Sequence, residues 1–319
     1  TSVLAILFSI WLFLQGNMSL FTCLMMVVSA FLVYSELESA GEMFFMLPMI
    51  DASIDRVEEI DRAPRMDEGG SVQVPKSHDI SFDHVDFSYV PGKRILKDVS
   101  VYANPGQKIA FVGSTGAGKT TLINLLMRFY EVDGGQILLD GVDTAAMTRE
   151  NLRDNFGMVL QDTWLFDGTI AENIAYGRRD ATREEIVAAA RAACCDHFIR
   201  TLPQGYDTPL SGETTGVSQG QMQLLTIARA MLTDPAILVL DEATSSVDTR
   251  TEVEIQKAMA RLMEGKTSFV IAHRLSTIRS ADLILVVRDG DIVERGTHRE
   301  LMARNGFYAS LYRSQFEAA

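Results

Sequence analysis

Cysteine is scarce in this sequence, with three residues among 319. Cys23 lies in an apolar stretch, while Cys194 and Cys195 are adjacent, which is a poor arrangement for an ordinary structural disulfide. None of the three has the ligand spacing of a structural zinc site. We therefore predict that all three thiols are reduced and that none binds a metal.

Basic residues are fewer than acidic ones: the chain has 29 lysines and arginines and 42 aspartates and glutamates, which gives a net charge of -13. A nucleic-acid partner would require a basic face, so we predict no nucleic-acid partner. No internal repeat or low-complexity tract is present. The hydrophobic share of 47% is ample for a buried core.

The N-terminus has neither the basic n-region nor the small-residue cleavage site of a signal peptide. It contains an apolar stretch at Val3–Leu14, too short to cross a bilayer, and a longer one from Leu20 to Ile50 after a polar break. We therefore predict that residues 1–62 are the C-terminal part of a transmembrane domain. They would comprise the end of one membrane helix, one complete membrane helix and its cytoplasmic extension, so that we expect the chain to be a fragment.

A linker is predicted at residues 63–78, where Gly69, Gly70 and Pro75 break regular structure, and a globular domain at residues 79–319. Basic residues after the apolar span favour a cytoplasmic location for this domain. These residues are Arg56, Arg62 and Arg65. We accordingly expect a multi-pass protein of the plasma membrane with its globular domain in the cytoplasm.

Three carboxylates occur late in the longer apolar stretch, at Glu36, Glu38 and Glu42. Ionisable residues at membrane depth usually face a cavity or a partner helix. The alternative, which we favour, is that they lie near the inner interface within reach of water.

A glycine-rich segment in the globular domain follows the pattern G-x-x-x-x-G-K-[ST]. Its residues are Gly113, Ser114, Thr115, Gly116, Ala117, Gly118, Lys119 and Thr120. The run Lys108–Val112 before it predicts a buried strand, and Thr121–Phe129 after it predicts a helix. Backbone N–H groups and the helix dipole attract phosphate at such a junction. We predict a nucleoside triphosphate site in which Lys119 binds the outer phosphates and Thr120 is a ligand of Mg²⁺.

Further patterns indicate a mixed α/β domain. Ile80–Tyr89 and Val99–Ala103 alternate as antiparallel strands do, and Thr182–Arg200 has a helical pattern. The apolar strand from Ile237 to Leu240 ends in Asp241 and Glu242. A strand that ends in acids can hold Asp241 beside a magnesium ion while Glu242 polarises the attacking water.

On these motifs the chain resembles the ATP-binding cassette (ABC) exporters over nearly its whole length. The resemblance implies an α/β P-loop NTPase fold with a RecA-like core, an antiparallel β subdomain and an α-helical subdomain, preceded by membrane-spanning α-helices. It also implies ATP and Mg²⁺ as cofactors, ATP hydrolysis, and partnership with a second half-transporter and the membrane. Thr121 would extend the phosphate site of the Walker A loop, and Ile237–Glu242 would be Walker B.

The same resemblance assigns roles to residues outside these two motifs. Tyr89 would stack on adenine, and Gln161 in the Q-loop would contact magnesium and water. His273 in the switch region would contact the γ-phosphate. Further family segments are the D-loop at Thr244–Asp248 and the exporter segment at Gly212–Glu213.

The signature segment departs from the family pattern Leu-Ser-Gly-Gly-Gln, because this chain has Val-Ser-Gln-Gly-Gln at 217–221. In the family this segment caps the γ-phosphate held by the opposite subunit, so Ser218, Gly220 and Gln221 would bind the partner's nucleotide. Gln219 either weakens this cap or points away from it. The first alternative, which we favour, predicts one subunit of a heterodimeric, multidrug-type exporter, and the second a homodimer.

Two other classes of protein share parts of this pattern. One is a soluble cassette ATPase that acts on DNA or ribosomes, which the apolar N-terminus and the acidic charge oppose. The other is a regulatory module that binds nucleotide without hydrolysis, which Glu242 and His273 oppose. The transported substrate is not readable from the residues of this chain.

Overall fold

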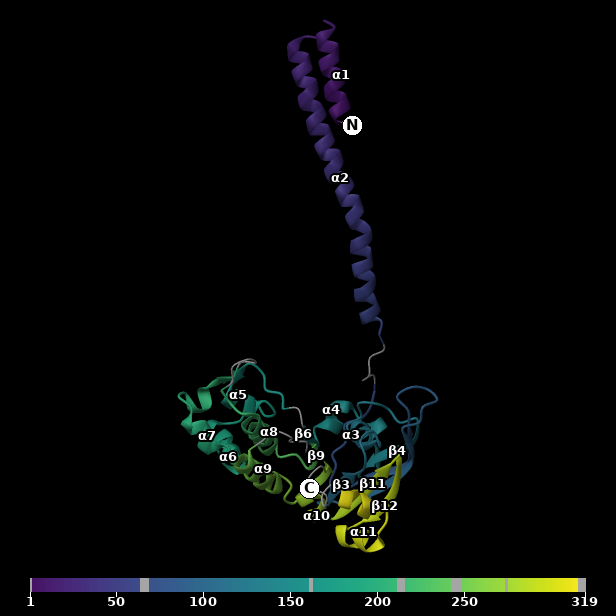
Figure 1. Cartoon of the computed structure of the whole chain (residues 1–319), viewed down its shortest axis with the longest axis vertical. Coiled ribbons are helices and arrows are strands. Elements are labelled where there is room, and N and C mark those ends of the chain that lie inside the picture. Colours follow the sequence, from purple (N-terminus) through teal and green to yellow (C-terminus); the bar gives the residue numbers. More distant parts are fainter. Residues whose placement is uncertain are drawn as a thin grey trace. The chain divides into compact units, whose positions relative to one another are not determined.

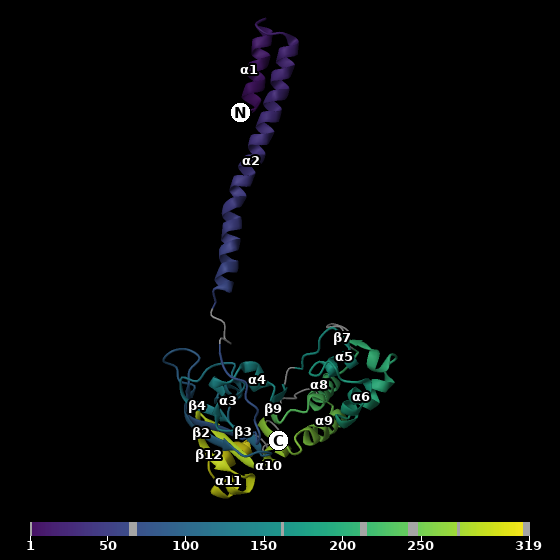
Figure 2. The same cartoon turned by 180° about the vertical axis from the view of Figure 1, so that it is seen from behind.

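The computed structural model describes residues 2–63, 69–160, 163–210, 216–241, 248–272 and 275–314. The chain divides into two compact units, Thr1–Met66 and Asp67–Ala319. Each is described by itself below (Figures 1 and 2).

The first unit is a helical hairpin made of α1 (Ser2–Leu14) and α2 (Leu20–Asp61). Ser19 caps the start of α2, because its side chain accepts a hydrogen bond from the Thr22 backbone N–H at 3.2 Å. The buried Cys23 thiol donates to the Ser9 carbonyl at 3.5 Å and ties the two helices together. Among the described residues, α2 is the helix that is long and apolar enough to cross a membrane.

The described residues of the second unit form three sheets. The antiparallel sheet has the order β2-β1-β4-β5, and the larger sheet has the order β12-β11-β3-β10-β9-β6. In the larger sheet every pairing is parallel except that of the edge strand β12. The strands are β1 (Ile80–Phe87), β2 (Leu96–Ala103), β3 (Lys108–Val112), β4 (Gly134–Leu139), β5 (Val142–Asp143), β6 (Phe156–Val159), β9 (Ile237–Asp241), β10 (Thr267–Ile271), β11 (Leu283–Arg288), β12 (Asp291–Gly296), and the small pair β7 (Gly168–Thr169) and β8 (Pro209–Leu210).

Helices follow most strands of the larger sheet, as parallel connections require. Helices α5 to α8 gather with α9 on one side of this unit, away from β4 and β12 (Figures 1 and 2). The helices are α3 (Lys119–Leu126), α4 (Arg149–Arg153), α5 (Ile170–Ala175), α6 (Arg183–Ala192), α7 (Asp196–Thr201), α8 (Gln219–Thr233), α9 (Thr249–Leu262), α10 (Leu275–Ser280), α11 (His298–Arg304) and α12 (Phe307–Tyr312), with short 3₁₀ turns at Thr144–Ala146 and Gly205–Asp207.

Alternate residues of the parallel strands serve two separate cores. In β3, Ile109 and Phe111 join the antiparallel sheet and α3 in one core, whereas Ala110 and Val112 join α5 to α9 in the other. Successive side chains of a strand point to opposite faces, so a sheet covered on both sides reads as a continuous apolar run. Such a sheet forms a rigid platform whose strand ends position a site.

The predicted helix over Thr182–Arg200 is wrong in its continuity, because the structure ends α6 at Ala192 and begins α7 at Asp196. Cys194 between them has φ 61°, which no α-helix accommodates. The helix predicted to reach Phe129 likewise ends at Leu126, and Arg128 there has φ 51°. Both breaks are backbone features that the helical residue pattern did not reveal.

Candidate nucleotide-binding site

The predicted phosphate loop lies between the end of β3 and the start of α3, as the sequence pattern requires. Gly118 caps α3 with φ 110°, a left-handed conformation that favours glycine. The loop closes on itself because the Ala117 N–H donates to the Ser114 carbonyl at 3.2 Å. The site residues Ser114, Thr115, Gly116 and Thr120 are exposed, whereas Ala117, Gly118 and Thr121 are buried.

Lys119 is buried at the N-terminus of α3 and folds back over the loop. Its Nζ donates to the main-chain carbonyls of Gly113 at 2.8 Å and Ser114 at 2.9 Å. Burial lowers the pKa of Lys119, and the Asp241 carboxylate opposes that effect by its charge. The ammonium group therefore lies over the loop, in the field of the acid that ends β9.

The strand order explains why Asp241 acts on Lys119. Strand β10 lies between β3 and β9, and all three run parallel. Their carboxyl ends therefore meet at one edge of the sheet, where ligands bind in open α/β folds. Asp241, which is half-buried, ends β9 at this edge.

The three predicted catalytic residues, Gln161, Glu242 and His273, lie outside the described residues. In the sequence each follows closely on a strand of the larger sheet. The strand ends are Val159 of β6, Asp241 of β9 and Ile271 of β10. Their roles remain predictions, as do those of the segments Thr244–Asp248 and Gly212–Glu213, of which only Asp248 is described; it caps α9.

The donor chemistry at the loop suits Mg²⁺. A nucleotide-bound magnesium ion takes one or two protein oxygens and fills its remaining positions with phosphate and water. The exposed Thr120 hydroxyl at the start of α3 and the Asp241 carboxylate are oxygen donors of this kind. Over the described part of the chain, no group of three or more His, Cys, Asp or Glu could form a protein-only metal cage.

Tyr89 is attached to the same helix that carries the phosphate loop. Its hydroxyl donates to Thr121 Oγ1 at 3.3 Å and accepts from Asn124 Nδ2 at 3.2 Å. The ring packs edge-on against Phe87 at 4.8 Å and Tyr130 at 4.9 Å, and the residue as a whole remains 43% exposed. Its hydroxyl is thus fixed while the residue stays accessible to a base.

Tyr130 and Asn124 are contacts of Tyr89 that sequence reasoning missed. A signal was present, since the aromatic pair Phe129–Tyr130 follows the phosphate-loop helix directly. Only the fold shows that Tyr130 of this pair returns to the Tyr89 ring.

The signature segment forms the N-terminus of α8. The Ser218 side chain accepts from the Gln221 backbone N–H at 3.3 Å, and the Gln221 side chain accepts from the Ser218 backbone N–H at 2.9 Å. This reciprocal capping box fixes both residues. Gly220 is buried and Gln219 is exposed on the first turn. Helices α3 and α8 lie in different parts of the unit (Figures 1 and 2).

This arrangement of sheet, loop and helix defines a P-loop nucleotide-binding domain of the kind found in ATPases. The family model of the ABC transporter matches residues 96–245. The chain therefore carries an ABC transporter ATP-binding domain, and domains of this family are ATPases. The predicted fold class is confirmed.

Similar proteins extend this finding to exporters. A fatty acid ABC transporter ATP-binding/permease protein of Mycobacterium bovis is 57% identical over 264 residues, covering 82% of this chain and 42% of the relative. An ATP-dependent lipid A-core flippase of Methylobacillus flagellatus is 48% identical over 261 residues, covering 81% of this chain and 45% of the relative. The chain thus spans less than half the length of these relatives.

A solved structure shows the same likeness in three dimensions. The structure of a bacterial Atm1-family ABC exporter with ATP bound superimposes with a TM-score of 0.80 at 35% sequence identity. The match covers 99% of this chain and 56% of that chain. The resemblance to exporters is confirmed at the level of the family.

Proposed function

We propose that this chain is the ATP-hydrolysing part of an ABC exporter of the plasma membrane, in which residues 79–319 form the nucleotide-binding domain. The observation that carries the proposal is the placement of Lys119 over the phosphate loop and within the field of Asp241. The apolar helix α2 that precedes the domain and the exporter relatives support a membrane setting. Residues 1–62 would then be the end of the transmembrane domain and 63–78 the connection between the two.

In the proposed reaction, the Lys119 ammonium gives up its hydrogen bonds to the loop carbonyls and binds the outer phosphates of ATP instead. The backbone N–H groups of the loop bind the same phosphates. Mg²⁺, when bound, would neutralise phosphate charge and would be held by Thr120, Asp241 and Gln161. Glu242 would take a proton from the attacking water, and His273 would hold the γ-phosphate. Tyr89 would hold the adenine at the other end of the site.

The signature would act on the nucleotide of a partner subunit. Ser218, Gly220 and Gln221 begin a helix whose dipole favours an anion, and the capping box holds them in place. Gln219 adds a side chain to this first turn, where the family has glycine. We propose that the cap is thereby weakened and that the chain pairs with a different half-transporter.

Loss of the γ-phosphate on hydrolysis would open the paired nucleotide domains, and that motion would drive the membrane helices. We propose that the cargo of this chain is a lipid-like amphiphile, because its relatives include a fatty acid transporter and a lipid A-core flippase. Membrane fractionation tests the setting, since a soluble cassette ATPase would remain in the supernatant.

Phosphate release tests the catalytic proposal with two variants. Glu242→Gln should bind Mg-ATP as the unaltered chain does and release no phosphate, whereas Lys119→Met should bind it roughly 30- to 150-fold more weakly. Phosphate release by Glu242→Gln at the unaltered rate would remove Glu242 from the mechanism. Absence of release by the unaltered chain with its partner, despite ATP binding, would identify a regulatory module.

The oligomeric state tests the heterodimer. The Glu242→Gln chain should stay monomeric with Mg-ATP in light scattering, and the additional change Gln219→Gly should allow self-association. A stable dimer of the Glu242→Gln chain alone would favour the homodimer.

A further inference from the structure

The predicted linker is not a free tether where the structure describes it. The Ser71 N–H donates to the Ala146 carbonyl at 2.8 Å, and the Thr148 N–H donates to the Ser71 carbonyl at 3.2 Å. The Asn151 side chain then binds both main-chain groups of Gln73, accepting from the N–H at 2.8 Å and donating to the carbonyl at 3.0 Å. Residues 69–79, which we call the docked linker, therefore lie against the segment Thr144–Arg153.

Asp140 holds the second half of the docked linker. Its carboxylate accepts from the backbone N–H groups of Lys76, Ser77 (2.9 Å) and Asp79 (3.1 Å) and from the Ser77 hydroxyl at 2.8 Å. Burial by itself would raise the pKa of Asp140, but these hydrogen bonds together hold it well below its usual range. The carboxylate is thus committed to the linker backbone.

Gly70 shows how closely the docked linker approaches its support. A Cβ at Gly70 would lie 2.6 Å from the carbonyl carbon and oxygen of Met147. Gly69 beside it has a similar left-handed backbone, with φ 127° against 115°, yet a Cβ there would meet nothing within 4 Å. The two glycines therefore have similar φ angles, but only at Gly70 would an added Cβ collide with a neighbouring segment.

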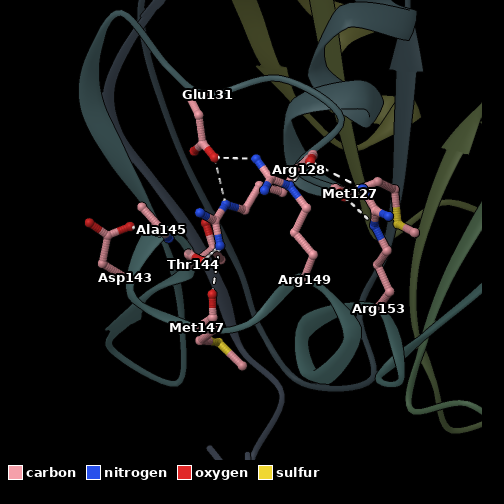
Figure 3. Close-up of polar contacts among 9 residues, drawn as sticks. All are labelled: Met127, Arg128, Glu131, Asp143, Thr144, Ala145, Met147, Arg149 and Arg153. Atoms are coloured by element: carbon pink, nitrogen blue, oxygen red, sulfur yellow. Dashed lines mark hydrogen bonds and ion pairs between the residues drawn. The ribbon is translucent and has the colours of Figure 1, made fainter. Parts of the chain in front are cut away.

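The segment under the linker is fastened to the end of α3 by a group of charged side chains, drawn in Figure 3. This arginine cluster consists of Arg128, Glu131, Arg149 and Arg153. Arg128 donates to the carbonyls of Thr144 at 3.1 Å and Met147 at 2.6 Å, so it joins the linker's support to the residue after α3.

The other arginines reach α3 from α4. The buried Arg149 donates to the Arg128 carbonyl at 3.1 Å and pairs with Glu131 at 2.5 Å, and Glu131 also pairs with Arg128 at 2.9 Å. Arg153 donates to the carbonyls of Met127 at 3.1 Å and Arg128 at 3.2 Å. Positive charges beside the C-terminus of a helix interact favourably with its dipole.

Both ends of the candidate nucleotide site are attached to this cluster. Helix α3 begins at Lys119 and ends directly before the carbonyls that the arginines bind. Tyr130, which precedes Glu131 in the chain, packs against the Tyr89 ring. The phosphate loop and the base-facing ring thus share one anchor with the docked linker.

We propose that Arg128, with the rest of the arginine cluster, is a positioning residue that couples docking of the linker to nucleotide binding. ATP bound between Lys119 and Tyr89 restricts the motion of α3 and of the turn at Tyr130. Through the hydrogen bonds of the arginine cluster, the segment Thr144–Met147, where the linker docks, is restricted as well. Because the linker follows α2 in the chain, a movement of that membrane helix would favour or oppose docking of the linker. The inference rests on the proposed binding of Mg-ATP at the phosphate loop.

Hydrogen exchange of the whole chain in detergent, with and without Mg-ATP, tests this coupling. Mg-ATP should slow exchange in peptides of residues 69–79 by about fivefold or more, the range of ordinary site-to-site coupling. Because such coupling is reciprocal, Gly70→Ala should speed linker exchange and raise the Kd for Mg-ATP by a similar factor of about five. Gly69→Ala is the matched control for backbone strain, because its Cβ meets no neighbour, and it should change both quantities much less than Gly70→Ala does.

Arg128→Lys tests the cluster itself. It keeps the positive charge, but a single amine cannot reproduce the fork that reaches Glu131 and two carbonyls. This variant should bind Mg-ATP without slowing linker exchange. Arg304→Lys is its control, because Arg304 also donates to a main-chain carbonyl, that of Arg295 at 3.0 Å, but in α11.

Each result is decisive. ATP binding without any change in linker exchange in the unaltered chain would overturn the coupling, as would equal effects of the two glycine variants or a persisting ATP effect in Arg128→Lys. Failure of the unaltered chain to bind Mg-ATP would instead refute the proposed function on which the inference rests.

Discussion

Replacement of Lys119 by methionine separates binding from stability at the phosphate loop. Methionine fills nearly the same volume as the lysine stem but has no donor, so it leaves no large cavity at this buried position. In the nucleotide-free chain the ammonium satisfies two carbonyls, at 2.8 and 2.9 Å. Ser114 is exposed, so water can replace the lysine there.

The expected effects differ in size. The free energy of unfolding of the nucleotide-free chain should change by no more than about 1 kcal/mol, the net worth of an ordinary hydrogen bond. Binding should suffer more, because charge-assisted bonds to phosphate are lost, at a cost of about 2–3 kcal/mol or roughly 30- to 150-fold in Kd. Fluorescence titration with an ATP analogue and thermal melts measure the two quantities.

A Kd of Lys119→Met for Mg-ATP within about threefold of that of the unaltered chain would contradict the phosphate-binding role of Lys119, since a threefold change is under 1 kcal/mol. A collapse of the melting temperature without nucleotide would contradict it as well. That outcome would make Lys119 a structural residue of the loop.

Three further predictions concern other parts of the domain. Tyr89→Ala should weaken ATP binding by about tenfold, from the loss of stacking worth about 1–3 kcal/mol, while Tyr89→Phe should keep most of it; equal losses in a titration would contradict stacking. Burial lowers the pKa of His298, so its contribution to stability is full above the unfolded value near 6.5 and is lost as pH falls below it; thermal melts should show less acid sensitivity in His298→Gln. Burial also raises the pKa of the Cys195 thiol, so a maleimide should label the partly exposed Cys194 in the native chain and Cys195 only after unfolding; native labelling of both, seen by mass spectrometry, would contradict this.

Much of the fold was predictable from local pattern. The alternation at Ile80–Tyr89 and Val99–Ala103 predicts two antiparallel strands, and the structure has them as the pair Ile80–Phe87 and Leu96–Ala103, because alternation is a local signal. The continuity of Thr182–Arg200 was not predictable, since the left-handed backbone at Cys194 has no mark in the composition. The contact between Tyr89 and Tyr130 joins residues that are 41 positions apart in the chain, so it depends on the tertiary fold.

The sequence by itself determined the chemical parts of the candidate site. The glycines, Lys119 and Thr120 are contiguous, so the loop's capacity to bind phosphate follows from composition and order alone. The tertiary structure decided how distant parts meet. Strand order brings Asp241 within the field of Lys119, and the arginine cluster joins the linker to α3. The physical reason is that contiguous motifs are specified by local backbone geometry, whereas strand order and buried ion pairs depend on packing between residues far apart in the chain.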